Sequence, residues 1–522
     1  MELVLPAGTI DQIHGLSKNL HDAYERKLVV NADLTRQLVS FQANKQTPVY
    51  RWFKYKEGFS ASLIEYILGR TCIRSGVLLD PFAGAGTTVF VASKRGLDAV
   101  GIELLPIGYE VMKVRKAISN GGASKVQAAA RRWLMEKPWH RETEKAAIAH
   151  LRITKGAYAE DTEALLARYL RRVEREEDAM VREALRFAAL CVLESISFTR
   201  KDGQYLRWDY RSGRRQGKNT FDKGKIYTFD EAITKKLEEI YEDLAYPRDL
   251  FNTNAIETRG HIDLVNGSVL EALPGQPSET FDGIVTSPPY CNRYDYTRTY
   301  ALELALLGVD EEGIKALRQA MVSCTVENRE KQPGKWGDRV EEALDAFNGQ
   351  ELLQAVIRFL YEEKAANRLN NNGIPRMVNN YFLEMALVIF ECARVLKSGA
   401  PLVMVNDNVR YAGIAIPVDL ILSEIARKAG FEVEKIWVLP RGKGNSSQQM
   451  GRHGRTELRK CVYLWRKLFR LTLFNLEVPK CGVTPRSFRV ATMDPANFSS
   501  AIPPIIFLNL PPRASPFISK YR

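Results

Sequence analysis

Four residues near the middle of the chain, Ser287-Pro288-Pro289-Tyr290, combine groups that could hold a planar amine. Neither proline has an N–H, so the turn presents backbone carbonyls, while Ser287 adds a hydroxyl and Tyr290 a flat aromatic face. Two acceptors pulling on the hydrogens of an exocyclic amine would localise the nitrogen lone pair for attack on a methyl donor. Tyr290 could stack on a base swung out of a helix, as base-modifying enzymes require.

The segment resembles motif IV of the DNA amino-methyltransferases, which methylate cytosine N4 or adenine N6. The resemblance implies that Ser287, Pro288, Pro289 and Tyr290 are the catalytic residues. In that family serine is commoner at the first position among the cytosine-N4 enzymes, and Asp or Asn among the adenine enzymes. Ser287 therefore favours cytosine N4, with adenine N6 as the alternative.

A glycine-rich turn between residues 80 and 88 could bind the methyl donor. The apolar run before it predicts a buried strand, and Gly84 and Gly86 allow a tight turn into a helix with free N–H groups. Glu103 ends the next apolar strand, where a carboxylate can accept both hydroxyls of a ribose. Val89 replaces the third glycine of a dinucleotide fingerprint, which argues against a nicotinamide cofactor.

This turn closely resembles motif I of the same family, and the resemblance implies S-adenosylmethionine as cofactor. A looser resemblance to motif X covers the aromatic segment 48–60, in which Ser60 can also cap the following helix. Where the family has Gly-Asp near the adenine, this chain has Gly267-Ser268, so that Ser268 or Asp263 can replace the acid only weakly. The expected cofactor-binding residues are Phe59, Ser60, Asp80, Phe82, Ala83, Gly84, Gly86, Thr87, Thr88, Glu103 and Ser268.

A basic and aromatic stretch predicts contact with nucleic acid. Residues 200–225 hold nine Lys or Arg against three Asp, interleaved with aromatic residues. Guanidinium groups suit phosphates and guanine edges, and aromatic rings can stack on bases, although a charged run is often only a solvated face. With two further loops included, the expected DNA-binding residues are Arg200, Lys201, Tyr205, Arg207, Trp208, Arg211, Arg293, Arg452 and Arg455.

Composition sets outer limits on the function. The 522 residues carry a net charge of +13, which favours a polyanionic partner. The seven cysteines form no C-x-x-C pair, so we expect a reducing cytoplasm, no disulfide framework and no metal site. No signal segment and no run of 18 apolar residues occurs, so we expect no membrane association.

The alternation of strand and helix patterns predicts the fold class α/β. We expect a Rossmann-like, doubly wound methyltransferase sheet with large, mainly helical insertions and a Pro-rich C-terminal extension. The expected parts are an N-terminal helical segment (1–45), a catalytic domain (46–108, 261–300 and 376–466), a helical and basic insertion that reads the DNA target (109–260), a helical insertion (301–375) and the extension (467–522).

The resemblance implies site-specific methylation of double-stranded DNA by a prokaryotic or phage protein. The resemblance implies a restriction-modification system with a cognate restriction endonuclease as genetic neighbour, and it leaves monomer and dimer open. An RNA amine as substrate and a non-enzymatic DNA-binding protein with the same fold are alternatives. Cytosine C5 methylation would need a thiolate, and Cys291 follows Tyr290, whereas the nucleophile of that family follows a proline directly.

Overall fold

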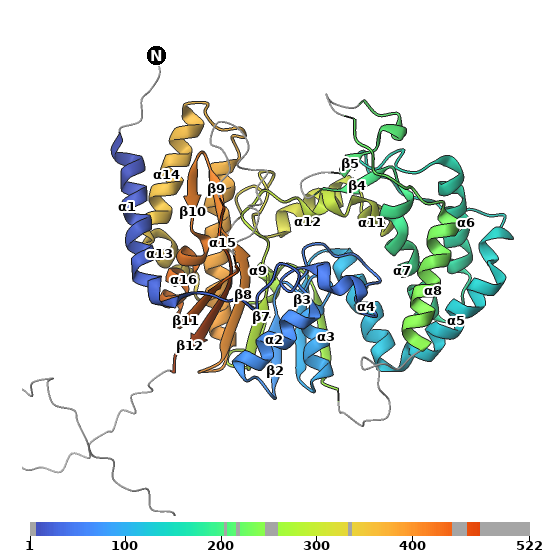
Figure 1. The fold of residues 1–522 in the computed structure, drawn as a ribbon, viewed down its shortest axis with the longest axis horizontal. Helices are drawn as coiled ribbons and strands as arrows, with labels where there is room; N and C mark the ends of the chain where they lie inside the picture. The colour runs from blue at the N-terminus through green and yellow to red at the C-terminus, as the bar shows by residue number, and fades with distance from the viewer. Residues whose placement is uncertain are drawn as a thin grey trace, which may run out of the picture. The chain divides into compact units, whose positions relative to one another are not determined.

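The computed structural model describes residues 7–202, 206–215, 220–245, 259–331, 337–440 and 457–469. All of them belong to the compact unit Met1–Arg470. Its centre is a sheet whose strands, in chain order, are β1 (Leu28–Val30), β2 (Val77–Asp80), β3 (Asp98–Glu103), β6 (Ile262–Asn266), β7 (Gly283–Thr286), β8 (Pro401–Asp407), β11 (Phe431–Val438) and β12 (Lys460–Lys467) (Figure 1).

The strand order across the sheet is β1-β11-β12-β8-β7-β2-β3-β6. β12 runs antiparallel to both of its neighbours, and the other described neighbours in this sheet pair in parallel. From β2 the chain first adds strands on one side, through β3 to β6, and then on the other, through β7 to β8. The point of reversal lies between β2 and β7, and open α/β sheets bind ligands at the carboxyl ends of strands at such a point.

Side chains of each strand alternate between two hydrophobic cores. In β8, Leu402 and Met404 enter one core, and Val403 and Val405 enter the other, as a period of two requires. The first core holds α1 (Ala7–Tyr24), α9 (Val269–Ala272), α13 (Val340–Asn348), α14 (Glu351–Ala365), α15 (Ile374–Val395) and α16 (Val418–Ala429). The second holds α2 (Ala61–Thr71) and α3 (Thr87–Lys94).

A third core is built by helices inserted between the strands. It contains α4 (Pro106–Ala117), α5 (Ala123–Glu136), α6 (Glu160–Glu174), α7 (Ala179–Ile196), α8 (Phe229–Ala245), α10 (Tyr296–Thr299), α11 (Ala301–Leu306) and α12 (Glu311–Ala320). Figure 1 shows α5 to α8 gathered beside one another. Two hairpins lie outside the main sheet, namely β4 (Thr199–Lys201) with β5 (Leu206–Trp208) and β9 (Val409–Tyr411) with β10 (Ile414–Ile416).

The inserted helices are tied to the segment that precedes α2. Asp243 of α8 accepts hydrogen bonds from the backbone N–H of Val49, at 2.9 Å, and from the indole N–H of Trp52, at 2.7 Å. It also pairs with the Arg51 guanidinium at 2.6 Å. The side chain of Asp243 is almost fully buried, so these three bonds compensate for removing its charge from water.

The α/β class and the doubly wound sheet predicted from the sequence are confirmed. The N-terminal segment, expected to be mainly helical, also supplies β1, which pairs in parallel with β11 as an eighth strand. α13 and α14, which fall within the expected insertion 301–375, pack in the same core as α15 and the sheet. Within the described residues, no helix has the length and apolar character needed to cross a membrane.

Candidate active site

The glycine turn after β2 and the Ser-Pro-Pro-Tyr loop after β7 lie side by side. The Thr286 hydroxyl donates a hydrogen bond to the Asp80 carboxylate at 2.7 Å. The Thr88 hydroxyl, in the first turn of α3, donates a second hydrogen bond to the Val285 carbonyl of β7 at 3.3 Å. Asp80 is buried, and burial raises the pKa of its carboxyl to about 6. The hydrogen bonds of Asp80 and Thr88 therefore join the glycine turn to the strand that carries the Ser-Pro-Pro-Tyr loop.

The glycine turn and the Ser-Pro-Pro-Tyr loop both line a cavity of about 500 Å³. This volume falls within the range of about 300–1,000 Å³ that is usual for ligand pockets. Its lining includes both predicted loops and parts of the segment before α2, and the predicted residues among them are Phe59, Phe82, Ala83, Gly84, Thr87, Lys201, Glu103, Ser268, Ser287, Pro288, Pro289 and Tyr290. Residues distant in sequence are thus brought together around one hollow.

The glycine turn is shaped by two residues in the left-handed region. Gly84 has φ +56°, and Gly86, which precedes α3, has φ +81°. A Cβ on Gly86 would lie 2.6 Å from Met112 and 2.8 Å from Phe90, so a larger residue would not fit. Gly86 does not line the cavity itself, and its contribution is to let the chain turn tightly beneath it.

Glu103 stands at the edge of the cavity with both carboxylate oxygens engaged. One oxygen accepts the N–H of Gly84 and the other accepts the N–H of Leu105, each at 2.7 Å. Burial raises the pKa of Glu103 to about 8, and the two backbone bonds act in the opposite direction. Gly108 packs against this arrangement, because a Cβ there would lie 2.7 Å from the Gly84 carbonyl oxygen and 2.9 Å from the Glu103 side chain.

In the Ser-Pro-Pro-Tyr loop, the Ser287 hydroxyl is placed to donate its proton to the protein. Its oxygen lies 3.2 Å from the Val405 carbonyl on β8 and 3.3 Å from the Tyr290 hydroxyl. A hydroxyl has one proton and two lone pairs. With the proton directed to Val405, the lone pairs remain available as acceptors. Burial raises the pKa of Tyr290, so its phenol stays neutral.

Ser60 and Ser268, two predicted cofactor residues, are occupied by protein contacts. Ser60 is fully buried, donates to the Leu38 carbonyl at 2.5 Å and accepts from the Leu63 N–H at 3.1 Å, so it caps α2. Ser268 lines the cavity, and its hydroxyl donates to the Ala320 carbonyl at 2.6 Å. Ser60 is thus placed as a helix cap rather than as a contact with a ligand.

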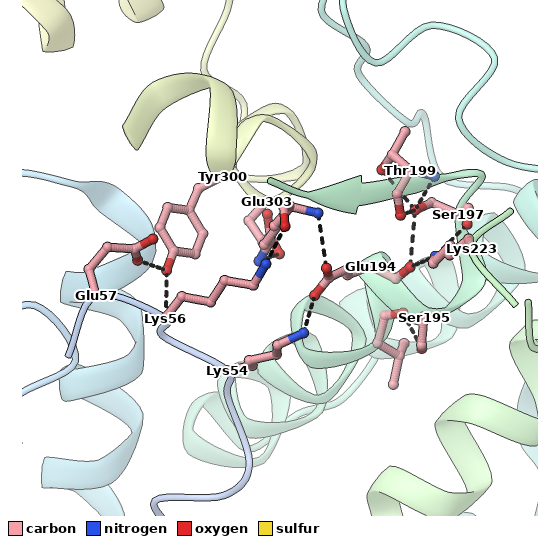
Figure 2. A network of polar contacts seen from close by, with 12 residues as sticks. Lys54, Lys56, Glu57, Glu194, Ser195, Ser197, Thr199, Lys223, Tyr300 and Glu303 are labelled. Carbon is pink, nitrogen blue, oxygen red and sulfur yellow. Dashed lines mark hydrogen bonds and ion pairs between the residues drawn. The ribbon is translucent and has the colours of Figure 1, made fainter. Parts of the chain in front are cut away.

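A polar network links the segment before α2 to the inserted helices at one side of the cavity (Figure 2). The Lys201 ammonium pairs with Glu303 at 2.5 Å, and both side chains are almost fully buried. The Glu57 carboxylate accepts a hydrogen bond from the Tyr300 hydroxyl, as Figure 2 shows, and a second one from the Tyr294 hydroxyl. Glu194 pairs with Lys54 at 3.2 Å and accepts the Lys201 backbone N–H at 3.0 Å.

This network gives Lys201 a structural environment that the sequence did not indicate. Its ammonium also lies 4.4 Å from the centre of the Tyr300 ring, a cation–π distance. A lysine bound in this way does not reach a phosphate at the surface. Tyr55 and Glu57 line the cavity but were not singled out from sequence. Both stand in the aromatic segment 48–60, and this position was the only signal for them.

The other predicted DNA-binding residues lie in different surroundings. Arg200 is exposed on β4, and Arg293 is half-buried and donates to the Asn370 side chain at 3.4 Å. The remaining described ones are held by neighbours: Arg207 over the Phe221 ring, Trp208 beneath the Arg214 guanidinium, and Arg211 in a salt bridge of 2.7 Å with Asp209. Tyr205, Arg452 and Arg455 lie outside the described residues.

Cys291, the thiol of the C5-methylation alternative, is fully buried and is not part of the cavity lining. Burial raises the pKa of its thiol well above the usual value. A nucleophilic cysteine instead needs access and a lowered pKa. The geometry therefore opposes a thiolate mechanism.

Comparison with known proteins agrees with this geometry. Residues 18–112 match a family model described as DNA methylase, of the N6/N4 type. The chain is 54% identical over 463 residues to type II methyltransferase M.AvaI from Nostoc sp. and from Anabaena variabilis, which covers 88% of this chain and 94% of each relative. It is 39% identical over 455 residues to type II methyltransferase M.BsoBI from Geobacillus stearothermophilus, covering 83% of this chain and 88% of that relative.

Proposed function

Since the chain belongs to the type II DNA methyltransferases, which use S-adenosylmethionine as methyl donor, we propose that it methylates N4 of a cytosine swung out of the duplex. The observation that carries this proposal is the position of the Ser287 hydroxyl, whose oxygen lies 3.2 Å from the Val405 carbonyl, an acceptor for its proton. Its lone pairs and the Pro288 carbonyl then accept the two hydrogens of the target amine, and Tyr290 stacks on the base.

The residues around the glycine turn fit the cofactor. Bound S-adenosylmethionine supplies a methyl carbon on a positively charged sulfur, together with a ribose that offers two hydroxyl donors. Glu103 retains lone pairs for these hydroxyls, Gly84 lets the backbone approach closely, and Phe59 and Phe82 offer apolar surface. The donor and the amine are thereby held next to each other, and positioning contributes most of the acceleration.

No strong base is needed before attack. With the cofactor bound, the amine nitrogen would bond to the methyl carbon as the carbon–sulfur bond breaks, and the nitrogen would become acidic only when it carries the new methyl group. It then releases one proton to solvent. Within the site the protein therefore has to orient the lone pair rather than remove a proton in advance.

The ionisation of Glu103 predicts how cofactor affinity depends on pH. Hydroxyl donors bind the carboxylate better than the carboxylic acid, and the pKa of free Glu103 is raised to about 8 by burial. Below this pH, binding must remove a proton, so we expect affinity to rise by up to about tenfold per pH unit from pH 6 to 8 and then to level off. Calorimetric titration with S-adenosylmethionine at several pH values measures this change.

Glu103→Gln is the matched variant for that titration, because an amide has nearly the same shape and does not ionise. We expect weaker binding with little pH dependence over the same range. An equally steep profile in Glu103→Gln would assign the titration to another group.

Sequencing that distinguishes modified bases, applied to DNA from cells that express the protein, tests the proposed function. We expect N4-methylcytosine at one recognition sequence. N6-methyladenine at a single sequence would change the proposed target base to adenine. Transfer of labelled methyl groups to RNA rather than to duplex DNA would change the proposed substrate to RNA. Absence of any transfer, with no binding of S-adenosylmethionine by calorimetry, would indicate a non-enzymatic DNA-binding protein.

The same experiment gives the sequence that the insertion 109–260 would read. We propose this part for target recognition because it carries the β4–β5 hairpin, with Arg200 exposed and Trp208 half-buried beside it. Because the relatives are type II methyltransferases, we propose that the genetic partner is a restriction endonuclease that cuts the same sequence.

A further inference from the structure

A second cavity adjoins the proposed reaction centre. Its volume is about 660 Å³. Tyr290, Asp407 and Lys460 line both this cavity and the first one. The aromatic residue proposed to stack on the target base therefore stands in a wall that the two hollows share.

Most of the remaining lining comes from the chain that leads from β1 towards α2. This stretch carried no recognisable motif, yet it supplies mainly polar side chains, and the ends of β8, β11 and β12 supply the rest. The residues other than the three shared ones are Arg36, Gln37, Val39, Ser40, Gln42, Val405, Leu439 and Cys461.

The shared wall has a defined charge arrangement. The Lys460 ammonium lies 2.5 Å from the Asp407 carboxylate, and their side chains are 36% and 22% exposed, so neither is sealed in the core. Burial raises the pKa of the Asp407 carboxyl, and the charges of Lys460 and Arg36 act in the opposite direction. Within the described residues the Arg36 guanidinium makes no hydrogen bond or ion pair of its own. Two cations and one carboxylate leave a net positive charge beside Tyr290.

We propose that this second cavity receives the target nucleotide, with Lys460 donating to the edge of the base and Arg36 contacting a phosphate. The inference rests on the proposed function and adds the residues that select the base. Lysine offers donors and no acceptor. Along its Watson–Crick edge cytosine has two acceptors, N3 and O2, whereas adenine has only N1 on that edge, so a lysine that faces this edge favours cytosine. Asp407 is the positioning residue that holds the ammonium.

Lys460→Met tests the base contact, on duplexes that carry the recognition sequence mapped for the wild-type protein. We measure kcat/KM with cytosine and with adenine at the target position. Loss of a charge-assisted hydrogen bond predicts a fall of about 10- to 100-fold with cytosine, a smaller fall with adenine, and an unchanged Kd for S-adenosylmethionine. Lys460→Arg keeps the charge and should recover part of the selectivity. Lys435→Met, an exposed lysine on β11, is the matched control.

Arg36→Gln tests the phosphate contact at an exposed residue, where folding is not at risk. We expect weaker DNA binding and a plot of log affinity against log salt whose slope is shallower by about one. The preference for cytosine should stay unchanged. Arg26→Gln, another exposed arginine in the same N-terminal region, should keep the wild-type slope.

The outcomes separate this inference from the proposed function. If the wild-type protein transfers no methyl group to DNA, the proposed function fails and the inference with it. If the wild-type protein methylates cytosine while Lys460→Met keeps the wild-type kcat/KM and base preference, and Arg36→Gln keeps the salt slope, only the inference is overturned. An equal loss of cofactor affinity in Lys460→Met would also overturn it, because Lys460 would then serve the donor cavity.

Discussion

Ser287→Ala is expected to lower kcat for methyl transfer by about 100-fold and to leave the Kd for S-adenosylmethionine near the wild-type value. The substitution removes one of two acceptors that orient the target amine, and loss of one preorganised hydrogen-bonding group at a reaction centre typically costs about 10²–10³ in kcat. Ser287 is placed for this role by its contact with the Val405 carbonyl at 3.2 Å. Single-turnover transfer of labelled methyl groups to duplex DNA measures the effect.

Ser75→Ala is the control, because Ser75 is an exposed serine outside the cavity lining. It should match the wild-type protein in kcat and in cofactor binding. If Ser287→Ala kept kcat within about twofold of that control, the amine would be oriented by backbone carbonyls alone, and the role given to the hydroxyl would be wrong.

Gly108→Ala is expected to weaken cofactor binding by about 30-fold, although it adds a single methyl group and touches no proposed catalytic residue. The new Cβ would lie 2.7 Å from the Gly84 carbonyl and 2.9 Å from Glu103, closer than packed atoms allow. Overpacking of this kind costs about 1–3 kcal/mol, and a loss of 2 kcal/mol corresponds to about 30-fold in Kd. Calorimetry with S-adenosylmethionine measures the change.

Gly69→Ala provides a matched control, because Gly69 also lies in a helix, α2, but has nothing within 4 Å of the added Cβ. We expect unchanged cofactor binding and a small gain in stability, about 0.4–1 kcal/mol, from the lower entropy of the unfolded chain. Equal cofactor affinity in both variants would mean that the Gly84 turn shifts to accommodate the added methyl group. The tight packing around Glu103 would then not be needed for cofactor binding.

The sheet and the meeting of the two loops were predictable from sequence, because each motif follows a buried strand and such strands end at one edge. Lys201 shows where this reasoning stops. A basic run looks the same whether its lysine faces water or a buried carboxylate, and Glu303, its partner, lies 102 residues away. Only the packing of α11 against α7 brings the pair together.

The wall between the two cavities was not predicted for a related reason. Asp407 and Lys460 each end or begin an ordinary strand, and nothing in their neighbouring residues marks them. They meet because β12 inserts antiparallel beside β8, which sets Lys460 opposite Asp407 in the register. The pairing of particular side chains depends on a register that the sequence does not specify.

The hydrogen bond between Thr286 and Asp80 spans 206 positions of the chain but only two adjacent strands. Within that stretch the chain from the end of β3 to the start of β6 leaves the sheet and returns to a neighbouring strand without separating the loops. Selection can therefore lengthen, shorten or exchange the residues between β3 and β6, which include the insertion proposed for target recognition, while the two loops stay in place. One reaction centre can in this way serve a lineage of proteins with many different targets.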